Sequence, residues 1–148
     1  WTPMHAEESA LWSLDRKDGM EKAYCCFNSN ARDFARFGQL LLNNGQWDDR
    51  QLISPAYLAE ATSPDTRLVY KDLGKPNHCY GFQYWILDYK GMKIPYMRGI
   101  LGQYVFTLPE KNAVIVRLGH KRSDTYTADQ HYPDDINTWL DAAMDLLQ

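Results

Sequence analysis

A glycine-containing turn between two strands limits most strongly what this chain can fold into. Gly99 and Gly102 lie within residues 96–104, between segments of strand character at 93–98 and 103–108. Glycines in such a place either let something approach the backbone closely or mark a bulge or bend of the sheet. The sequence therefore predicts a strand, a turn of bare backbone and a second strand, and it leaves both reasons for the glycines open.

Strand patterns continue on both sides of this turn. Residues 80–87 are rich in aromatics, residues 89–91 indicate a turn, and residues 109–112 turn the chain into an apolar run at 113–118. Four strands at hairpin spacing predict an antiparallel meander. The last two strands carry apolar residues on both faces, so the sheet needs cover on both sides.

Capping residues and apolar spacing predict three helices. With Asn30 as N-cap, Asp33 falls at the third helical position, and apolar residues then recur at helical spacing until residues 43–45 stop the helix. Ser54 followed by proline opens a second, short helix. Residues 134–147 carry an apolar stripe that can cover one face of the sheet. The expected fold class is α+β, an antiparallel sheet of four to five strands with this C-terminal helix packed on one face.

The segments outside the sheet give weaker patterns. Residues 10–14 predict one short strand in an otherwise irregular beginning, and residues 46–53 predict a small hairpin. The polar residues 66–77 indicate a surface loop. The apolar run at 23–27 is expected to be buried.

Composition sets outer limits on function. The 148 residues are 45% hydrophobic and 24% charged, enough for one domain or a large piece of one. A net charge of -3 without a basic stripe argues against a nucleic-acid partner. No apolar run reaches about 18 residues, so no transmembrane segment is expected. The chain begins at Trp1 without an initiator methionine, which predicts a mature product or a fragment.

Cysteines and histidines give no metal signal. Cys25 and Cys26 are adjacent and Cys79 is distant, so the paired Cys-x-x-Cys spacing of a structural zinc site is missing. All three are expected to be small buried hydrophobes. The four histidines stand in separate contexts, and we expect neither a metal nor a cofactor.

Four segments in a fixed order resemble the serine beta-lactamase-like hydrolases, which include class C beta-lactamases, related esterases and DD-peptidases. They are residues 29–45, 50–54, 80–85 and 99–104. Within that superfamily the sequence is most similar to the aminohexanoate-oligomer hydrolases. The resemblance implies a partial beta-lactamase/transpeptidase-like fold, with residues 1–148 forming the C-terminal portion of a single domain.

The resemblance also implies a mechanism. Such enzymes attack an amide or ester carbonyl with a serine, pass through an acyl-enzyme, and hold the oxyanion with two backbone N–H groups. Gly99 matches the glycine of the third family motif, and the Ile100 N–H matches the second oxyanion donor. Met97 and Arg98 occupy the places where the family often has Lys-Thr or His-Ser/Thr. Methionine cannot donate a charged hydrogen bond, so Arg98 is either a substitute in binding substrate or part of a structural ion pair.

Three further residues are expected near the substrate. Gly102 and Gln103 continue the third motif, and Tyr24 belongs to an apolar run that is either pocket wall or plain core. The implied substrate is a small-molecule or peptide-like amide or ester.

The nucleophile and its base are missing from the sequence. None of the six serines is followed three residues later by lysine, and none of the ten tyrosines begins Tyr-x-Asn or Tyr-x-Ser. Ser13 and Ser29 have arginine at that spacing, and arginine stays protonated and cannot act as a base. In the family order these motifs precede Trp1, so the missing N-terminal part of the same protein is the expected partner, and this chain alone is expected to be inactive.

A reading from a different class stays open. The same cleft could hold a peptide or ligand without cleaving it, as a non-catalytic binding module or degenerate hydrolase. A Ser-x-x-Lys and a Tyr-x-Asn/Ser upstream favour the enzyme, and their loss favours the binder. The residues leave the compartment open, although the family is often exported in bacteria.

Overall fold

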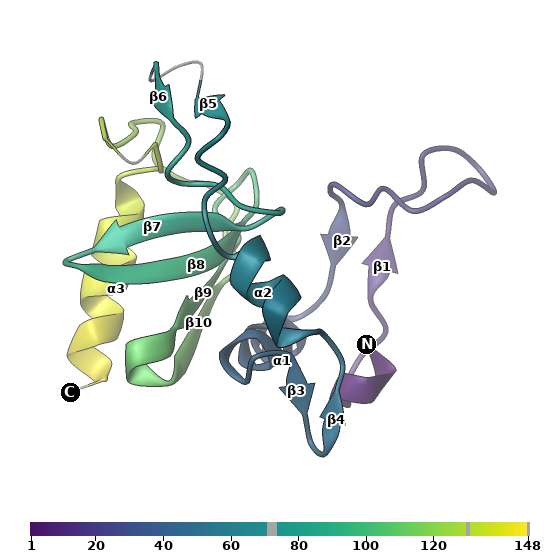
Figure 1. The fold of residues 1–148 in the computed structure, drawn as a ribbon. Helices are drawn as coiled ribbons and strands as arrows, with labels where there is room; N and C mark the ends of the chain where they lie inside the picture. Colours follow the sequence, from purple (N-terminus) through teal and green to yellow (C-terminus); the bar gives the residue numbers. More distant parts are fainter. Residues whose placement is uncertain (71–73, 130, 148) are drawn as a thin grey trace.

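A four-stranded antiparallel sheet forms the centre of the computed structural model, which describes residues 1–70, 74–129 and 131–147. The strands are β7 (Trp85–Tyr89), β8 (Met92–Arg98), β9 (Tyr104–Leu108) and β10 (Ala113–Arg117), in the order β10-β9-β8-β7. Figure 1 shows this sheet with one helix along it. The predicted four-stranded meander is confirmed. Within the described ranges, no helix has the length and apolar character to cross a bilayer.

The first strand of the meander begins later than the aromatic run predicts. The prediction of a strand over 80–87 is wrong for its first half, because β7 starts at Trp85. The Gly81 N–H donates to the Tyr84 carbonyl (2.8 Å) and the Phe82 N–H donates to the Ala61 carbonyl (2.9 Å). These bonds take the backbone away from the sheet, so the aromatics of 80–85 do not lie along one strand.

Helix α3 (Asp135–Leu146) covers one face of the sheet, as predicted. Its Ile136 and Leu140 are fully buried and pack in the same core as Tyr96 and Phe106, whose stacked rings are 5.3 Å apart. Burial of these apolar side chains is the main stabilising contribution on this face.

Helix α1 (Ala31–Leu42) covers the opposite face. Gly38 allows this close approach, because a Cβ there would lie only 3.1 Å from Val114 Cγ2 and 3.2 Å from Val105 Cγ1. Leu40 of the same helix is buried. The sheet therefore has cover on both sides, as the apolar character of its strands requires.

The N-terminus of α1 is fastened to the start of the chain by a buried carboxylate. The Asn30 side chain caps the Asp33 N–H (2.9 Å), as predicted. Asp33 accepts from the Glu7 N–H (2.8 Å), the Glu8 N–H (3.1 Å) and Arg36 Nη1 (2.9 Å). Burial alone would raise the pKa of Asp33, but these hydrogen bonds and the Arg36 charge outweigh it and lower the pKa.

Replacing Asp33 by asparagine is expected to lower the thermal stability at neutral pH. The asparagine side chain keeps one acceptor oxygen. Its NH₂ group replaces the second oxygen and faces groups that are themselves hydrogen-bond donors. Because the folded pKa of Asp33 is lowered, its stabilising contribution is present above the unfolded pKa of about 4 and is lost as pH falls through the folded value. The Tm gap between wild type and Asp33→Asn should therefore narrow at acidic pH. A gap that is constant from pH 7 to pH 3 would contradict this role of the charge.

The remaining elements are short. They are η1 (Thr2–Met4), β1 (Leu11–Trp12), β2 (Phe27–Asn28), β3 (Gln46–Trp47), β4 (Arg50–Gln51), α2 (Pro55–Ala61), β5 (Val69–Tyr70), β6 (Lys75–Pro76) and η2 (Pro109–Lys111). The small hairpin β3–β4 and the helix α2, capped by Ser54, are confirmed. Part of the predicted loop over 66–77 is instead the hairpin β5–β6. Residues 71–73 of that prediction lie outside the described residues.

Residues 10–28 form an arm that contains β1 and β2 and stands apart from the sheet (Figure 1). The predicted burial of 23–27 is wrong, because Tyr24 on the arm is 72% exposed. Phe27 does pack there, with its ring 5.0 Å from Trp1 and 5.4 Å from Trp12. An apolar run on a two-stranded arm has few neighbours to bury it.

The cysteine prediction is right for one residue of three. Cys79 is buried, as expected, and burial raises the pKa of its thiol. Cys25 and Cys26 are bonded to each other as a disulfide on the arm, and Cys26 is exposed. They are therefore not buried hydrophobes.

Candidate functional site

The turn between β8 and β9 is closed by its own backbone and by one side chain. The Gly99 N–H donates to the Gln103 carbonyl (2.7 Å), and the Gly102 N–H donates to the Gly99 carbonyl (3.4 Å). The Leu101 N–H donates to Gln103 Oε1 (3.1 Å). A Cβ on Gly99 would lie 2.5 Å from that same Oε1. Gly99 is thus a glycine in part because the Gln103 side chain occupies the space beside it.

Gly102 is fixed by both conformation and space. Its φ of +82° is a left-handed conformation that favours glycine. A Cβ there would overlap Arg117 Nη1 and lie 2.8 Å from the Lys121 carbonyl oxygen. What approaches the bare backbone at this point is therefore a side chain of the same protein.

Two arginines hold the carbonyls of the turn. Arg117 Nη1 donates to the Gly102 carbonyl, and Nη2 donates to the Lys121 carbonyl (2.9 Å). Arg122 Nε donates to the Ile100 carbonyl (3.0 Å). These bonds connect the turn to the end of β10 and to the segment that follows it, and charge-assisted bonds of this kind are among the stronger ones.

Ile100 presents an unused backbone donor. Its side chain is 80% exposed, and its N–H makes no hydrogen bond with any residue that the structure describes. The amides of Gly99, Leu101 and Gly102 are all bonded. The turn therefore offers one open N–H while its neighbours are held in place.

Arg98 stacks on an aromatic ring and makes no ion pair with a carboxylate among the described residues. Its guanidinium carbon lies 3.4 Å from the centre of the Trp85 ring, and Nη1 donates to the His131 carbonyl (3.0 Å). Among the described residues an aromatic face and a carbonyl contact this guanidinium in place of a carboxylate, and both roles expected for Arg98 stay predictions. Arg98 still keeps its charge beside the turn.

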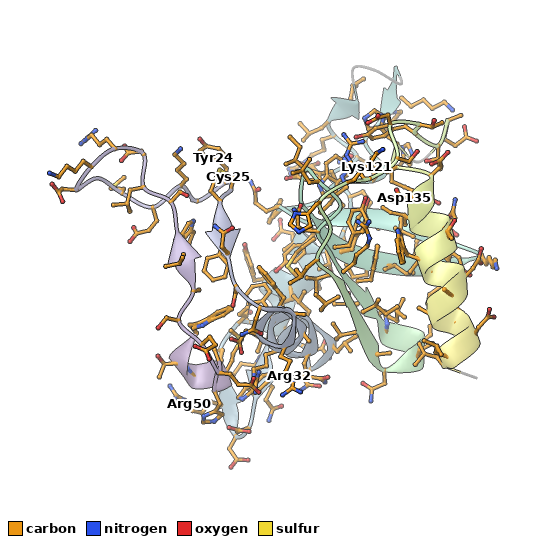
Figure 2. The ribbon with its side chains drawn as sticks, turned by 180° about the vertical axis from the view of Figure 1, so that it is seen from behind. Tyr24, Cys25, Arg32, Arg50, Lys121 and Asp135 are labelled. Carbon is orange, nitrogen blue, oxygen red and sulfur yellow. A yellow bond between two sulfur atoms is a disulfide. The ribbon has the colours of Figure 1, made fainter. Side chains whose placement is uncertain are left out.

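Met97 and Tyr24 lie in different places. Met97 pairs with Val105 across β8 and β9, and Val105 lies against Gly38 of α1, so Met97 belongs to the α1 face of the sheet. Tyr24 lies on the arm beside Cys25, just before β2 (Figure 2). Among the described residues, Tyr24 makes no recorded contact with the turn, so the structure does not bring these two candidates together.

Tyr104 opens β9 directly after the turn and was not foreseen as part of the site. It is only 1% exposed, and its hydroxyl has no hydrogen-bond partner among the described residues. Burial raises the pKa of Tyr104 to about 12, and the Asp135 charge adds to this while Arg117 opposes it. The hydroxyl therefore stays neutral at physiological pH and cannot act as a base.

Sequence reasoning missed Arg117, Arg122 and Tyr104. The basic run His120-Lys121-Arg122 was the available signal, but it does not say which carbonyl an arginine will reach. Arg117 and Tyr104 are directly paired across β10 and β9, so the pairing register, once known, would have placed them together.

Among the described residues, neither a metal-binding group nor either of two hollows lies at this turn. Within the described ranges no group of three or more histidine, cysteine, aspartate or glutamate side chains could hold a metal. Hollows of about 490 and 460 Å³ lie elsewhere, one lined by residues near Trp1 and the other around Ile86 and Asp88. The turn does not line either of them.

Comparison with solved structures finds a likeness to a hydrolase. The chain resembles "Putative 6-aminohexanoate-dimer hydrolase from Bacillus anthracis" with a TM-score of 0.65 and 25% sequence identity. The match covers 93% of this chain and 33% of that one, so the chain spans about a third of the neighbour's length. No protein-family model matches the sequence, and no curated protein matches it. The α+β fold is that of beta-lactamase-like hydrolases, and the likeness supports a hydrolase-like segment.

Proposed function

We propose that this chain is a segment of a serine hydrolase that cleaves an amide or ester through an acyl-enzyme, and that it supplies one oxyanion donor and part of the pocket wall. The open Ile100 N–H carries the proposal. It lies on a turn whose neighbouring amides and carbonyls are bonded, so it is preorganised to donate. The likeness to a hydrolase fold supports the same reading.

The chemistry needs a partner polypeptide. A serine outside this chain attacks the carbonyl carbon, its proton passes to a lysine or tyrosine of the same polypeptide, and the carbonyl oxygen becomes an oxyanion. The Ile100 N–H and the N–H of the serine donate to that oxygen. Loss of one such donor costs about 3–4 kcal/mol in the transition state. Collapse of the oxyanion breaks the bond to the amine or alcohol, which leaves with the proton held by the lysine or tyrosine. Water then attacks the acyl-enzyme, passes a proton through the same base to the serine oxygen, and releases the product acid.

The length of the structural neighbour supports a partner of this kind. Two thirds of that hydrolase have no counterpart in this chain. We place the serine and its base in polypeptide corresponding to that part. The wall opposite the turn would then come from the same polypeptide, which agrees with the position of Ile100 outside the two hollows.

The neighbours of Ile100 have proposed roles that follow from their contacts. Gly99, Gly102 and Gln103 fix the shape of the turn. Met97 would add an apolar wall, and Arg98 a positive charge toward substrate. Tyr24 reaches the pocket wall only if the partner polypeptide lies between the arm and the sheet.

The isolated chain is expected not to hydrolyse a chromogenic ester or a chromogenic cephalosporin. It lacks both Ser-x-x-Lys and Tyr-x-Asn/Ser, so no side chain can form the acyl-enzyme. Co-expression with the polypeptide that carries these motifs should restore turnover, with an initial burst of one product per complex. Turnover with a burst from the isolated chain would contradict the proposal.

A non-catalytic binding module is the second candidate. The absence of the nucleophile and the apolar Met97 at a motif position favour it. The same co-expression separates the two functions. A complex that binds an amide or ester, shows no burst and forms no acyl adduct by mass spectrometry would be a binder.

A further inference from the structure

The disulfide on the arm joins two adjacent residues. Cys25 and Cys26 are bonded through their sulfurs, and Cys26 is exposed. Together with the peptide bond between them, the disulfide closes an eight-membered ring. We infer that this ring is a redox-modification site, that its co-substrate is a dithiol, and that its reduction releases the arm.

The ring holds an unusual backbone conformation. Cys26 has φ +71°, a left-handed conformation that L-residues with a Cβ rarely adopt. While the two sulfurs are bonded, the side chains on either side of the peptide bond cannot separate. Once the ring opens, φ of Cys26 is free to return to the negative range, and this rotates the peptide group that carries the Cys25 carbonyl.

The carbonyls of both ring residues accept hydrogen bonds from Trp12 of β1 and from Ser13, the residue that follows β1. Trp12 Nε1 donates to the Cys25 carbonyl (3.2 Å), and it also donates to the Lys22 carbonyl (3.0 Å). The Ser13 N–H donates to the Cys26 carbonyl (3.1 Å). Rotation at Cys26 therefore acts directly on the hydrogen bonds that join the two sides of the arm.

Beyond these bonds, the arm is held by the Lys22 N–H bond to the Ser13 carbonyl (3.0 Å), the Asp15 N–H bond to the Met20 carbonyl (2.9 Å) and the packing of Phe27 on Trp1 and Trp12. Strands β1 and β2 are paired at only Leu11 with Asn28 and Trp12 with Phe27. Large apolar side chains of the arm are exposed: Leu11, Met20 and Tyr24 at more than 70%. A segment with few buried contacts opens at low free-energy cost, so the loss of two hydrogen bonds is enough to change it.

The exchange step balances without any further reactant. A dithiol such as dithiothreitol gives two electrons and two protons to the Cys25–Cys26 bond, which becomes two thiols, and the dithiol closes to its own disulfide. The Cys79 thiol does not compete with the dithiol for this disulfide, because Cys79 is buried and is not bonded to Cys25 or Cys26. The inference does not depend on the hydrolase proposal and is tested without catalysis.

The test is a redox titration of the chain in mixtures of reduced and oxidised dithiothreitol. Alkylation and mass spectrometry count the thiols, while NMR follows the Trp12 indole N–H and the Ser13 amide. We expect two thiols to appear in one two-electron step and both N–H groups to exchange at least about tenfold faster in the reduced protein. Resonances of β9 should not move.

Matched variants separate the effect of the disulfide ring from the effect of the backbone conformation at residue 26. Cys79→Ala should titrate like wild type, and the double variant Cys25→Ser with Cys26→Ser should match the reduced protein and ignore the dithiol. Cys25→Ser with Cys26→Gly allows positive φ without a ring and should retain more protection at Ser13 than the double serine variant. Unchanged exchange at Trp12 and Ser13 after full reduction, or a pair that resists dithiothreitol in the folded protein, would overturn the inference.

Discussion

Replacing Ile100 by proline is expected to lower kcat of the assembled hydrolase by about 10²- to 10³-fold with little change in KM. Proline has no N–H, so the substitution removes the proposed oxyanion donor. It breaks no hydrogen bond within the described residues, because the Ile100 N–H makes none there. The Ile100 side chain is mostly exposed, so its loss should not weaken the core. The measurement is steady-state hydrolysis of a chromogenic ester by the complex of this chain with the serine-bearing polypeptide.

Ile100→Ala is the matched control, because it removes the same side chain and keeps the N–H. It should retain nearly full activity. Equal losses in the alanine and proline variants would assign the effect to the side chain. Full activity in the proline variant would show that the Ile100 N–H does not stabilise the oxyanion.

Local patterns were enough to predict most of the sheet and helices. The Asn30 cap, the proline after Ser54 and the apolar runs of the strands act over a few residues, and the structure confirms these elements. The predicted site is less local. Gly99 and Gly102 marked the turn between β8 and β9, but the sequence could not say whether a ligand or the protein itself required these glycines.

The answer depends on contacts between distant residues. Arg117 and Arg122 reach back 15 and 22 residues to the carbonyls of Gly102 and Ile100. Such bonds depend on the pairing of β9 with β10 and on the path of the chain after β10. The residues of the turn predict neither this pairing nor this path, so the positions of the two arginines could not be predicted from the sequence.

The burial of side chains, like these long-range hydrogen bonds, could not be predicted from the local sequence. The run around Tyr24 is as apolar as a core strand, yet it lies on an arm with few neighbours. The strand prediction for the aromatic residues before Trp85 was wrong for a related reason, since a backbone bond to the end of α2 holds Phe82 outside the sheet. In both cases tertiary contacts decided the outcome.

The arginine bonds also explain why the turn can expose one amide. A turn with several unbonded groups would sample many shapes, and an oxyanion donor must already lie in position before the reaction. Here Arg122 holds the Ile100 carbonyl and Arg117 holds the Gly102 carbonyl, on either side of Leu101. If the proposed function is correct, these arginines act as positioning residues for the Ile100 N–H.

Replacing Gly102 by alanine is therefore expected to damage both stability and activity. Alanine at φ +82° costs about 1–2 kcal/mol, and its Cβ would also displace Arg117 from the turn. We expect the free energy of unfolding to fall by roughly 2–4 kcal/mol and Tm by about 5–10 °C. Because displacement of a catalytic group by about 1 Å can cost 10²-fold in rate, kcat of the assembled hydrolase should fall as well.

Gly91→Ala separates the conformational cost of alanine at positive φ from the displacement of Arg117. Gly91 has φ +89° in the turn between β7 and β8, and nothing lies within 4 Å of the Cβ that alanine would add. This variant should lose only the conformational cost, about 1–2 kcal/mol, and keep full activity in the complex. Thermal unfolding and ester hydrolysis of both variants decide the matter. If Gly102→Ala is no less stable than Gly91→Ala and equally active, then contact with Arg117 does not hold the turn, and the position of the Ile100 N–H must have another cause.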